Sequence, residues 1–200
     1  MVAMTFDDGP GDLTEQLLDL LEQYGVVATF YVLGRQVESR SDTIIRAHQL
    51  GCEIGNHSWS HPRLDRLSSD SIRKQLQDTS DAIESVIGVR PSNMRPTYGR
   101  INSTVEDVAG ELGLPLVFWS IDPSDYLPRD IDVIFFHIMD NVQDRDIIIQ
   151  HDVHERSIEA TVYLIPSLLN RGYQLVTVTE LMYFTGTIPE PGESYRHGRT

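Results

Sequence analysis

The sequence predicts an α/β domain built around a small, irregular barrel of parallel strands. Short apolar segments alternate with amphipathic segments of helical periodicity along the whole chain, which is the pattern of βα units whose strands are buried on both faces. About seven such units fit into the 200 residues, which favours a barrel over an open sheet. Because neither an internal repeat nor a linker divides the chain, we expect one domain.

The predicted strands are short apolar runs, each bounded by a turn or by an amphipathic segment. They are Val2–Phe6, Val26–Val32, Glu53–Gly55, Leu116–Ser120, Ile147–Gln150 and Gln174–Val178. In a parallel arrangement the carboxyl ends of these strands share one face, and functional side chains are expected just after them.

The predicted helices carry apolar stripes. In the first helix Leu17, Leu18, Leu20 and Leu21 form such a stripe, and Gly25 ends it. The third helix begins at a Ser68-Ser69-Asp70 cap and runs to about Ile87. The full set is Leu13–Tyr24, Asp42–Leu50, the segment from the Ser68-Ser69-Asp70 cap to Ile87, Asn102–Leu112, Asp130–Asn141, Ser157–Asn170 and Glu180–Phe184.

The end of the chain has a different character. From Gly186 it contains two prolines and scattered charges. We therefore expect residues 1–185 to form the domain and residues 186–200 a C-terminal tail, either a surface arm or a disordered end.

The charge balance excludes two classes of partner. There are 16 Lys and Arg against 30 Asp and Glu, a formal net charge of −14. Nucleic acids and anionic membrane surfaces both require clustered basic residues, so neither is expected as a partner. A neutral polymer, or one that becomes cationic as it reacts, is a more suitable partner for the negative electrostatic field of this chain.

Membrane insertion and disulfides are also not expected. The sequence has no run of about 18 apolar residues and a single cysteine, Cys52, which we interpret as a small buried residue. The chain opens directly in a strand, so we expect a domain of a longer secreted precursor, placed outside the cell or in its envelope. We expect a monomer.

Two adjacent carboxylates are the most informative local feature. Asp7 and Asp8 stand where the first strand meets a Gly-Pro turn. Two neighbouring ionised carboxylates repel one another unless a cation binds beside them or one of the two carries a proton. A solvated turn is the alternative, because Asp, Gly and Pro are favoured turn residues.

Two histidines follow the third strand. His57 and His61 are spaced i, i+4, which places both on one face of a helical turn and matches metal-ligand spacing. A hydrogen-bonded pair in a loop is the alternative. With a carboxylate, neutral imidazoles suit Zn²⁺ and its first-row neighbours, and such a set leaves positions open for water and substrate.

Three later stretches offer supporting chemistry. Arg95 can orient a carboxylate, and the turn at Tyr98 can present a backbone N–H to an oxyanion. The Asp122–Tyr126 stretch adds carboxylates, and His151 stands at a strand end, where an acid or base would lie. Alone, these stretches are also compatible with a surface turn or a buried structural histidine.

The order of these motifs resembles the polysaccharide deacetylase family, which is carbohydrate esterase family 4 or the NodB homology domain. The motifs are Thr5-Phe6-Asp7-Asp8-Gly9-Pro10, His57-Ser58-Trp59-Ser60-His61, Arg95-Pro96-Thr97-Tyr98-Gly99, Asp122-Pro123-Ser124-Asp125-Tyr126 and His151-Asp152. The resemblance covers the chain from Val2 to about Phe184. It implies a distorted (β/α)7 barrel and metal-dependent removal of acetyl groups from sugars.

The resemblance also implies roles for individual residues. Asp7 is similar to the catalytic base, and Arg95 to the residue that pairs with it. Tyr98 is similar to the oxyanion-binding residue, and His151 to the general acid, tuned by Asp125. The implied metal ligands are Asp8, His57 and His61, holding Zn²⁺ or another divalent metal such as Co²⁺, and Tyr126 and Trp59 are expected at the substrate.

The function implied is an N-deacetylase acting on N-acetylglucosamine units of peptidoglycan or chitin-like polymers. An acetylxylan esterase and a catalytically inactive carbohydrate-binding domain are the alternatives. Two positions depart from the family pattern. Thr97 replaces a usual proline and is expected to loosen the turn at Tyr98, and Tyr126 replaces a common tryptophan in the wall of the acyl pocket.

Overall fold

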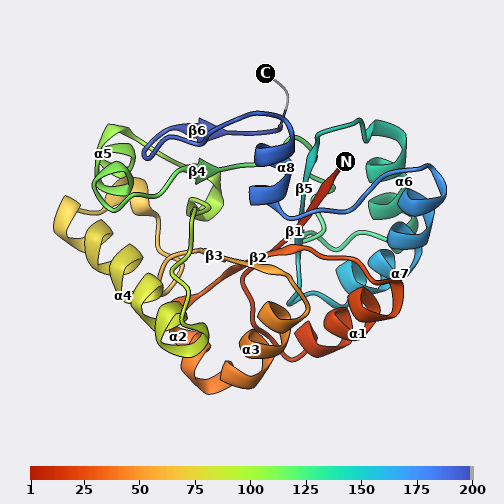
Figure 1. The fold of residues 1–200 in the computed structure, drawn as a ribbon, viewed down its shortest axis with the longest axis horizontal. Coiled ribbons are helices and arrows are strands. Elements are labelled where there is room, and N and C mark those ends of the chain that lie inside the picture. Colours follow the sequence, from red (N-terminus) through yellow and green to blue (C-terminus); the bar gives the residue numbers. More distant parts are fainter. Residues whose placement is uncertain (199–200) are drawn as a thin grey trace.

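Most strands of the protein lie at its centre with helices around them, as the ribbon of the computed structural model shows (Figure 1). The structure describes residues 1–198. The strands are β1 (Ala3–Asp7), β2 (Thr29–Val32), β3 (Glu53–Asn56), β4 (Leu116–Val117), β5 (Ile147–His151) and β6 (Ser194–Tyr195). The α-helices are α1 (Thr14–Tyr24), α2 (Gly34–Val37), α3 (Ser41–Gln49), α4 (Ser69–Ile87), α5 (Ser103–Glu111), α6 (Ile131–Asn141), α7 (Glu155–Asn170) and α8 (Val178–Phe184). Short 3₁₀ turns are η1 (Glu38–Arg40), η2 (Leu64–Arg66) and η3 (Thr97–Gly99).

The main sheet is parallel, in the order β3-β2-β1-β5. Its register places Asp7 opposite Tyr31 on β2 and opposite His151 on β5. Because the strands run in the same direction, the ends of β1, β3 and β5 meet at one edge. The sequence motifs that follow these strands are therefore brought together.

Isolated bridges extend this sheet into a distorted barrel. Met94 bridges Asn56 on one side and Leu116 on the other, while Ile121, just after β4, bridges Ile148 on β5. The predicted α/β class and the irregular barrel are thus confirmed. At Met94 and Ile121 the ring is continued by single bridging residues rather than by full strands.

One expectation for the last third of the chain is wrong. Gln174–Val178 is not a strand: Leu175 makes only a bridge to Val2, and Val178 already begins α8. Within residues 186–198, which were expected as a surface arm or a disordered end, β6 pairs in parallel with β4. This pairing satisfies backbone groups along β4 that would otherwise form an open edge, which explains why a polar segment is ordered there.

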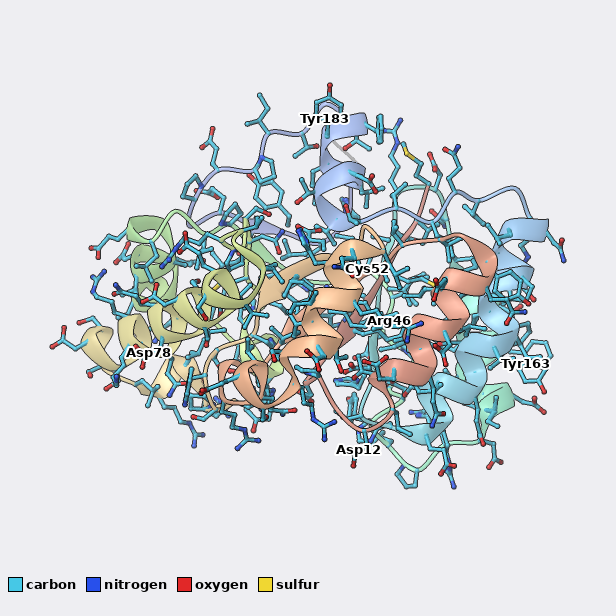
Figure 2. The ribbon with its side chains drawn as sticks, turned by 60° about the horizontal axis from the view of Figure 1, so that its bottom comes forward. Asp12, Arg46, Cys52, Asp78, Tyr163 and Tyr183 are labelled. Carbon is cyan, nitrogen blue, oxygen red and sulfur yellow. The ribbon has the colours of Figure 1, made fainter. Side chains whose placement is uncertain are left out.

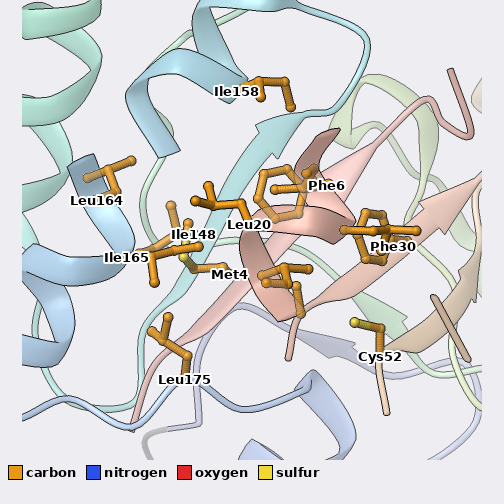
Figure 3. Packing of buried hydrophobic residues seen from close by; sticks show 14 of the residues in the cluster. Met4, Phe6, Leu20, Phe30, Cys52, Ile148, Ile158, Leu164, Ile165 and Leu175 are labelled. Carbon is orange, nitrogen blue, oxygen red and sulfur yellow. The ribbon is translucent and has the colours of Figure 1, made fainter. Parts of the chain in front are cut away.

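The main hydrophobic core lies between the sheet and the helices packed on its outer side. Figure 3 shows Met4 and Phe6 of β1 among side chains from β2, β5, α1 and α7. The predicted leucine stripe of α1 is buried, which confirms its orientation. Cys52 is buried as expected, and burial raises the pKa of its thiol to about 11.

Polar side chains join the helices at the surface. Arg46 of α3 lies between α3 and α1 in Figure 2 and bonds to Glu15, Asp19 and Glu22 of α1. In the core, Gln150 of β5 faces α7, where it donates to the carbonyl oxygen of Ser157. This contact accounts for a polar residue in an otherwise apolar strand.

The helix α8 closes the amino-terminal end of the barrel. Its Leu181 is fully buried in a cluster with Ala3, Val117 and Ile147 of three different strands. None of the described helices is long and apolar enough to cross a membrane.

We predict that Leu181→Ala lowers the free energy of unfolding by about 2–5 kcal/mol, because it opens a cavity inside the barrel. Tyr183→Ala is the control on the same helix, since the Tyr183 side chain is 77% exposed. It should change stability by less than about 0.5 kcal/mol. Urea unfolding of both variants measures the change in stability. Equal effects would contradict the packing of α8 across the end of the barrel.

Candidate metal centre and active site

A cavity of about 450 Å³ opens at the carboxyl ends of the strands. Seven of the residues selected from the sequence line it, namely Asp7, Asp8, His57, His61, Tyr98, Tyr126 and His151. Arg95 and Asp125 lie behind the cavity wall, each bonded to a lining residue. The remaining lining residues are Pro96, Gly99, Arg100, Trp119, Asp122 and Ile149.

Asp7 is buried and paired with Arg95. The Nη1 atom of Arg95 donates to Asp7 Oδ1 at 2.7 Å, and both side chains are almost completely buried. Burial raises the pKa of Asp7 above its ordinary value, and the guanidinium opposes this shift. The other donors of Arg95 are also satisfied, by Thr5 Oγ1 and by the carbonyl oxygens of Val117 and Phe118.

Asp8 faces both histidines. Its Oδ1 atom lies 3.6 Å from His57 Nε2 and 3.3 Å from His61 Nε2, and it is buried without a hydrogen-bond partner. Ligands at about 2.0–2.1 Å from one tetrahedral cation lie about 3.3 Å apart, so these three donor atoms fit a single metal ion.

The state of His57 supports this fit. Its Nδ1 atom lies 2.7 Å from the carbonyl oxygen of Arg95. A carbonyl only accepts, so Nδ1 carries the proton and Nε2 presents a lone pair toward Asp8. Burial lowers the pKa of His57 to about 3 despite the nearby Asp8 charge, so the ring is neutral at physiological pH. A neutral imidazole is what a metal requires.

The histidine pair comes together in a way that the spacing did not predict. Residues 57–61 form a loop rather than a helical turn. Ser58 and His61 have φ values of 68° and 62°, and Asp8 has a φ of 75°. The loop is held by Ser58, whose backbone N–H donates to Asn56 Oδ1 and whose hydroxyl accepts from the His61 N–H. Left-handed backbone at non-glycine residues is unfavourable and clusters at functional sites.

On the opposite side of the cavity His151 is paired with Asp125. Its Nδ1 atom lies 2.8 Å from Asp125 Oδ1, and its backbone N–H donates to Oδ2. The hydroxyl of Ser157, a residue that the sequence did not single out, donates to the same carboxylate. Burial alone lowers the pKa of His151, but Asp125, with Asp7 and Asp8, raises it to about 9, so the ring is cationic at neutral pH.

The turn at Tyr98 is better supported than expected. The Thr97 hydroxyl donates to the carbonyl oxygen of Pro62, which ties the turn to the histidine loop. Thr97, which was expected to loosen this turn, thus makes a hydrogen bond that a proline at this position could not make. Tyr98 itself has a φ of 61° and a side chain that is 58% exposed, with its ring 4.5 Å from that of His61. Across the cavity, the ring of Tyr126 lies 5.7 Å from that of His151.

Trp59, which was expected at the substrate, is not the tryptophan that lines the cavity. Trp59 is not among the cavity-lining residues and packs instead at Gly34 of α2, because the chain turns at Ser58. Trp119, which follows β4, lines the cavity beside Gly99. A Cβ on Gly99 would approach this indole to 2.8 Å, so the glycine makes room for it. The sequence contains no signal that tells which of the two tryptophans lines the cavity.

Asp152 belongs to the last of the sequence motifs, which assigned it no role. It is completely buried directly after β5, and burial raises its pKa to about 7. One of its oxygens, Oδ1, has no hydrogen-bond partner.

We predict that His57→Ala and His61→Ala each abolish stoichiometric binding of a divalent metal, because each removes one of three donors. His137→Ala is the matched control, since His137 lies exposed on α6. Metal analysis after dialysis measures the bound ion. Full occupancy in both loop variants would contradict the assignment.

Comparisons with known proteins agree with this geometry. The family model described as polysaccharide deacetylase matches residues 1–117. The chain is 42% identical to the peptidoglycan-N-acetylmuramic acid deacetylase PdaC of Bacillus subtilis, over 90% of this chain and 38% of that protein. It is 35% identical to the peptidoglycan-N-acetylglucosamine deacetylase PgdA of Listeria monocytogenes, with the same shares covered. The chain therefore spans about two fifths of the length of these two relatives.

A solved structure extends the likeness to the whole chain. The family 4 acetyl xylan esterase from Clostridium thermocellum, in complex with a cobalt ion, has a TM-score of 0.94 and 35% identity. The alignment covers 100% of this chain and 99% of that one. With its motifs, its barrel and these relatives, the chain belongs to the polysaccharide deacetylase family.

Proposed function

We propose that this chain is a metal-dependent N-deacetylase that removes acetyl groups from N-acetylglucosamine or related units of peptidoglycan-like or chitin-like polysaccharides. The observation that carries the proposal is the arrangement across one cavity of a three-donor metal site, a buried carboxylate and a cationic histidine. The names of the PdaC and PgdA relatives support peptidoglycan as the polymer.

Asp8, His57 and His61 would hold the metal. A divalent cation held there polarises the acetyl carbonyl and lowers the pKa of water. One carboxylate and two neutral imidazoles suit Zn²⁺, which we propose as the ion, with Co²⁺ as the alternative.

Asp7 would act as the general base. Its burial makes the carboxylate more basic than an exposed one, while Arg95 keeps it charged and fixes its orientation. Asp7 takes the proton of the attacking water, whose oxygen forms the new bond to the acetyl carbon. The backbone N–H of Tyr98 would donate to the carbonyl oxygen as negative charge develops there.

His151 would act as the general acid. Its Nδ1 atom is committed to Asp125, so the proton on Nε2 is the one available to the leaving group. The carbon–nitrogen bond breaks as this proton passes to nitrogen, and acetate and a free amine are released. Tyr126, which is 51% exposed beside His151, would contact the sugar. Trp59 is not assigned to the substrate, because it lies outside the cavity lining.

The acidic surface suits this reaction. A net charge of −14 favours a neutral glycan whose product is cationic, and no nucleic acid is proposed as a partner. We propose that the chain acts as a monomer at the cell envelope or outside the cell, where such polymers occur.

Two alternatives remain distinct from this proposal. The likeness to the Clostridium thermocellum esterase favours O-deacetylation of acetylxylan as the second candidate. An inactive carbohydrate-binding domain is disfavoured, because the residues proposed as base, acid and metal ligands are all present around one cavity.

Acetate release from N-acetylglucosamine oligomers, peptidoglycan glycan strands and acetylated xylan separates the three. We expect release from the N-acetylated polymers, its loss with a chelator, and its return on adding Zn²⁺. Faster release from xylan would favour the esterase, and no release from any polymer by the metal-loaded protein would favour the binding domain.

We predict that Asp7→Asn lowers kcat by about 10²–10⁴-fold while the metal stays bound, because an amide keeps the shape but cannot accept the proton. Metal analysis and acetate release on the same sample measure both properties. A variant that retains more than about a tenth of the wild-type rate would place the base elsewhere.

We also predict that the rate falls on the alkaline side as His151 loses its proton. The imidazolium is the acid, so activity persists below its pKa and declines above it. A bound cation offsets part of the charge of Asp7 and Asp8, so the alkaline limb should lie between the ordinary value of 6.5 and about 9. Asp125→Asn should move that limb to lower pH, because it removes the main group that raises the pKa. An unmoved limb in pH profiles of kcat/KM would show that another group is the acid.

The leaving group offers a further check on His151. An amine must be protonated as it departs, whereas an activated ester releases a better leaving group. His151→Ala should therefore lose several-fold more kcat/KM on an N-acetylglucosamine oligomer than on an activated acetyl ester. Equal losses would indicate a structural histidine.

A further inference from the structure

Asp152 lies next to His151 but takes no part in the cavity lining. Its carboxylate accepts a hydrogen bond from the hydroxyl of Thr14, the first residue of α1, at 2.5 Å. The same hydroxyl oxygen accepts from the backbone N–H of Gly11 at 2.7 Å. Asp152 is thereby connected to the loop that runs from Asp8 to α1.

The loop also rests directly on this carboxyl group. A Cβ built on Gly9 would lie 2.7 Å from the Asp152 carboxyl carbon, closer than non-bonded atoms approach. A Cβ on Gly11 would lie 3.0 Å from Val153. The two glycines therefore allow the loop to pack against residues 152 and 153 with no side chain between them.

The other side of the loop is held by the segment after β2. The Leu33 N–H donates to the Gly9 carbonyl oxygen at 2.9 Å, and the Gln36 side chain donates to the Asp8 carbonyl oxygen at 3.2 Å. Asp8 itself has a φ of 75°, a conformation that persists only when its surroundings impose it. The loop is thus clamped between Asp152 on one side and Leu33 and Gln36 on the other.

We propose that Asp152 is a positioning residue that sets the place of Asp8 at the metal site, through its packing on Gly9 and its bond to Thr14. It joins the loop of the proposed metal ligand to the end of β5, the strand that carries His151. The two halves of the active site are therefore held at a fixed separation. This inference rests on the proposed role of Asp8 as a metal ligand.

The test is the Zn²⁺ affinity of the apoprotein, measured by competition with a chromophoric chelator. Asp152→Ala should weaken binding about 10–100-fold, the range typical of residues that orient metal ligands. Asp152→Asn preserves the volume and the acceptor for Thr14, so it should stay within about threefold of wild type. An Asn variant as weak as the Ala variant would mean that charge rather than position matters, and would overturn the proposal.

Asp146 provides the matched control. It is a buried aspartate just before β5, at the opposite end of the strand, and accepts from Ser120 and from the Gln143 N–H. Asp146→Ala should lower stability while leaving Zn²⁺ affinity within about threefold of wild type. If it weakens Zn²⁺ binding as much as Asp152→Ala does, the effect is general destabilisation and the proposal fails.

Two further variants keep the test decisive if Asp152→Ala does not fold. Thr14→Val removes the donor at nearly constant volume and should weaken Zn²⁺ binding several-fold. Gly9→Ala should weaken it as well, because the added methyl group would meet the Asp152 carboxyl group. Unchanged affinity in either Thr14→Val or Gly9→Ala would overturn the proposal.

The wild-type titration separates this inference from the proposed function. A wild-type protein that binds no Zn²⁺ would refute the metal site itself. Tight wild-type binding with an unaffected, folded Asp152→Ala would refute only the role of Asp152.

Discussion

The buried ion pair between Asp7 and Arg95 is the interaction on which the site depends. Arg95 is completely buried at the centre of the barrel, where its guanidinium stacks 4.1 Å from the Tyr31 ring and reaches backbone oxygens next to β4. Two charges removed from water are tolerated only when each is paired and fully hydrogen-bonded. The pair also distinguishes two adjacent carboxylates: Asp7 Oδ1 is paired with Arg95 and Asp7 Oδ2 lies 3.7 Å from His57 Nε2, whereas Asp8 Oδ1 faces both histidines.

The hydrogen-bond partner of a buried group also decides its charge, and it gives His57 and His151 opposite charge states. His57 donates from Nδ1 to a backbone carbonyl, and its burial leaves it neutral. His151 faces the Asp125 carboxylate instead, which is itself held by Ser157, and it stays protonated. A neutral imidazole and a cationic imidazolium thus arise from one residue type because the oxygen opposite Nδ1 differs. The parallel sheet brings the strands that carry them to one edge, which links the fold to the chemistry.

The sequence predicted elements whose signal is local and missed those that depend on distant partners. The apolar run of β5 and the leucine stripe of α1 were recognisable in the sequence. A strand buried on both faces and a helix buried on one face each leave a regular pattern of apolar residues. The strand β6 had no such pattern, since Ser194 and Tyr195 pair with β4, which lies far away in the sequence. The motifs and the family resemblance selected residues of which seven line one cavity. Local spacing gave the wrong backbone for the histidine loop, and neither spacing nor motif could decide which tryptophan faces the cavity or that Asp152 lies beneath Gly9.

The most direct measurement is a double-mutant cycle on the buried pair, with the free energy of unfolding of wild type, Arg95→Met, Asp7→Asn and the double variant determined in urea. Arg95→Met should cost about 3–5 kcal/mol, because it leaves the Asp7 carboxylate buried without a counter-charge. Adding Asp7→Asn removes that charge, so the double variant should be more stable than the sum of the single losses predicts by about 1–3 kcal/mol. Losses that simply add would contradict the dependence of the site on this pair.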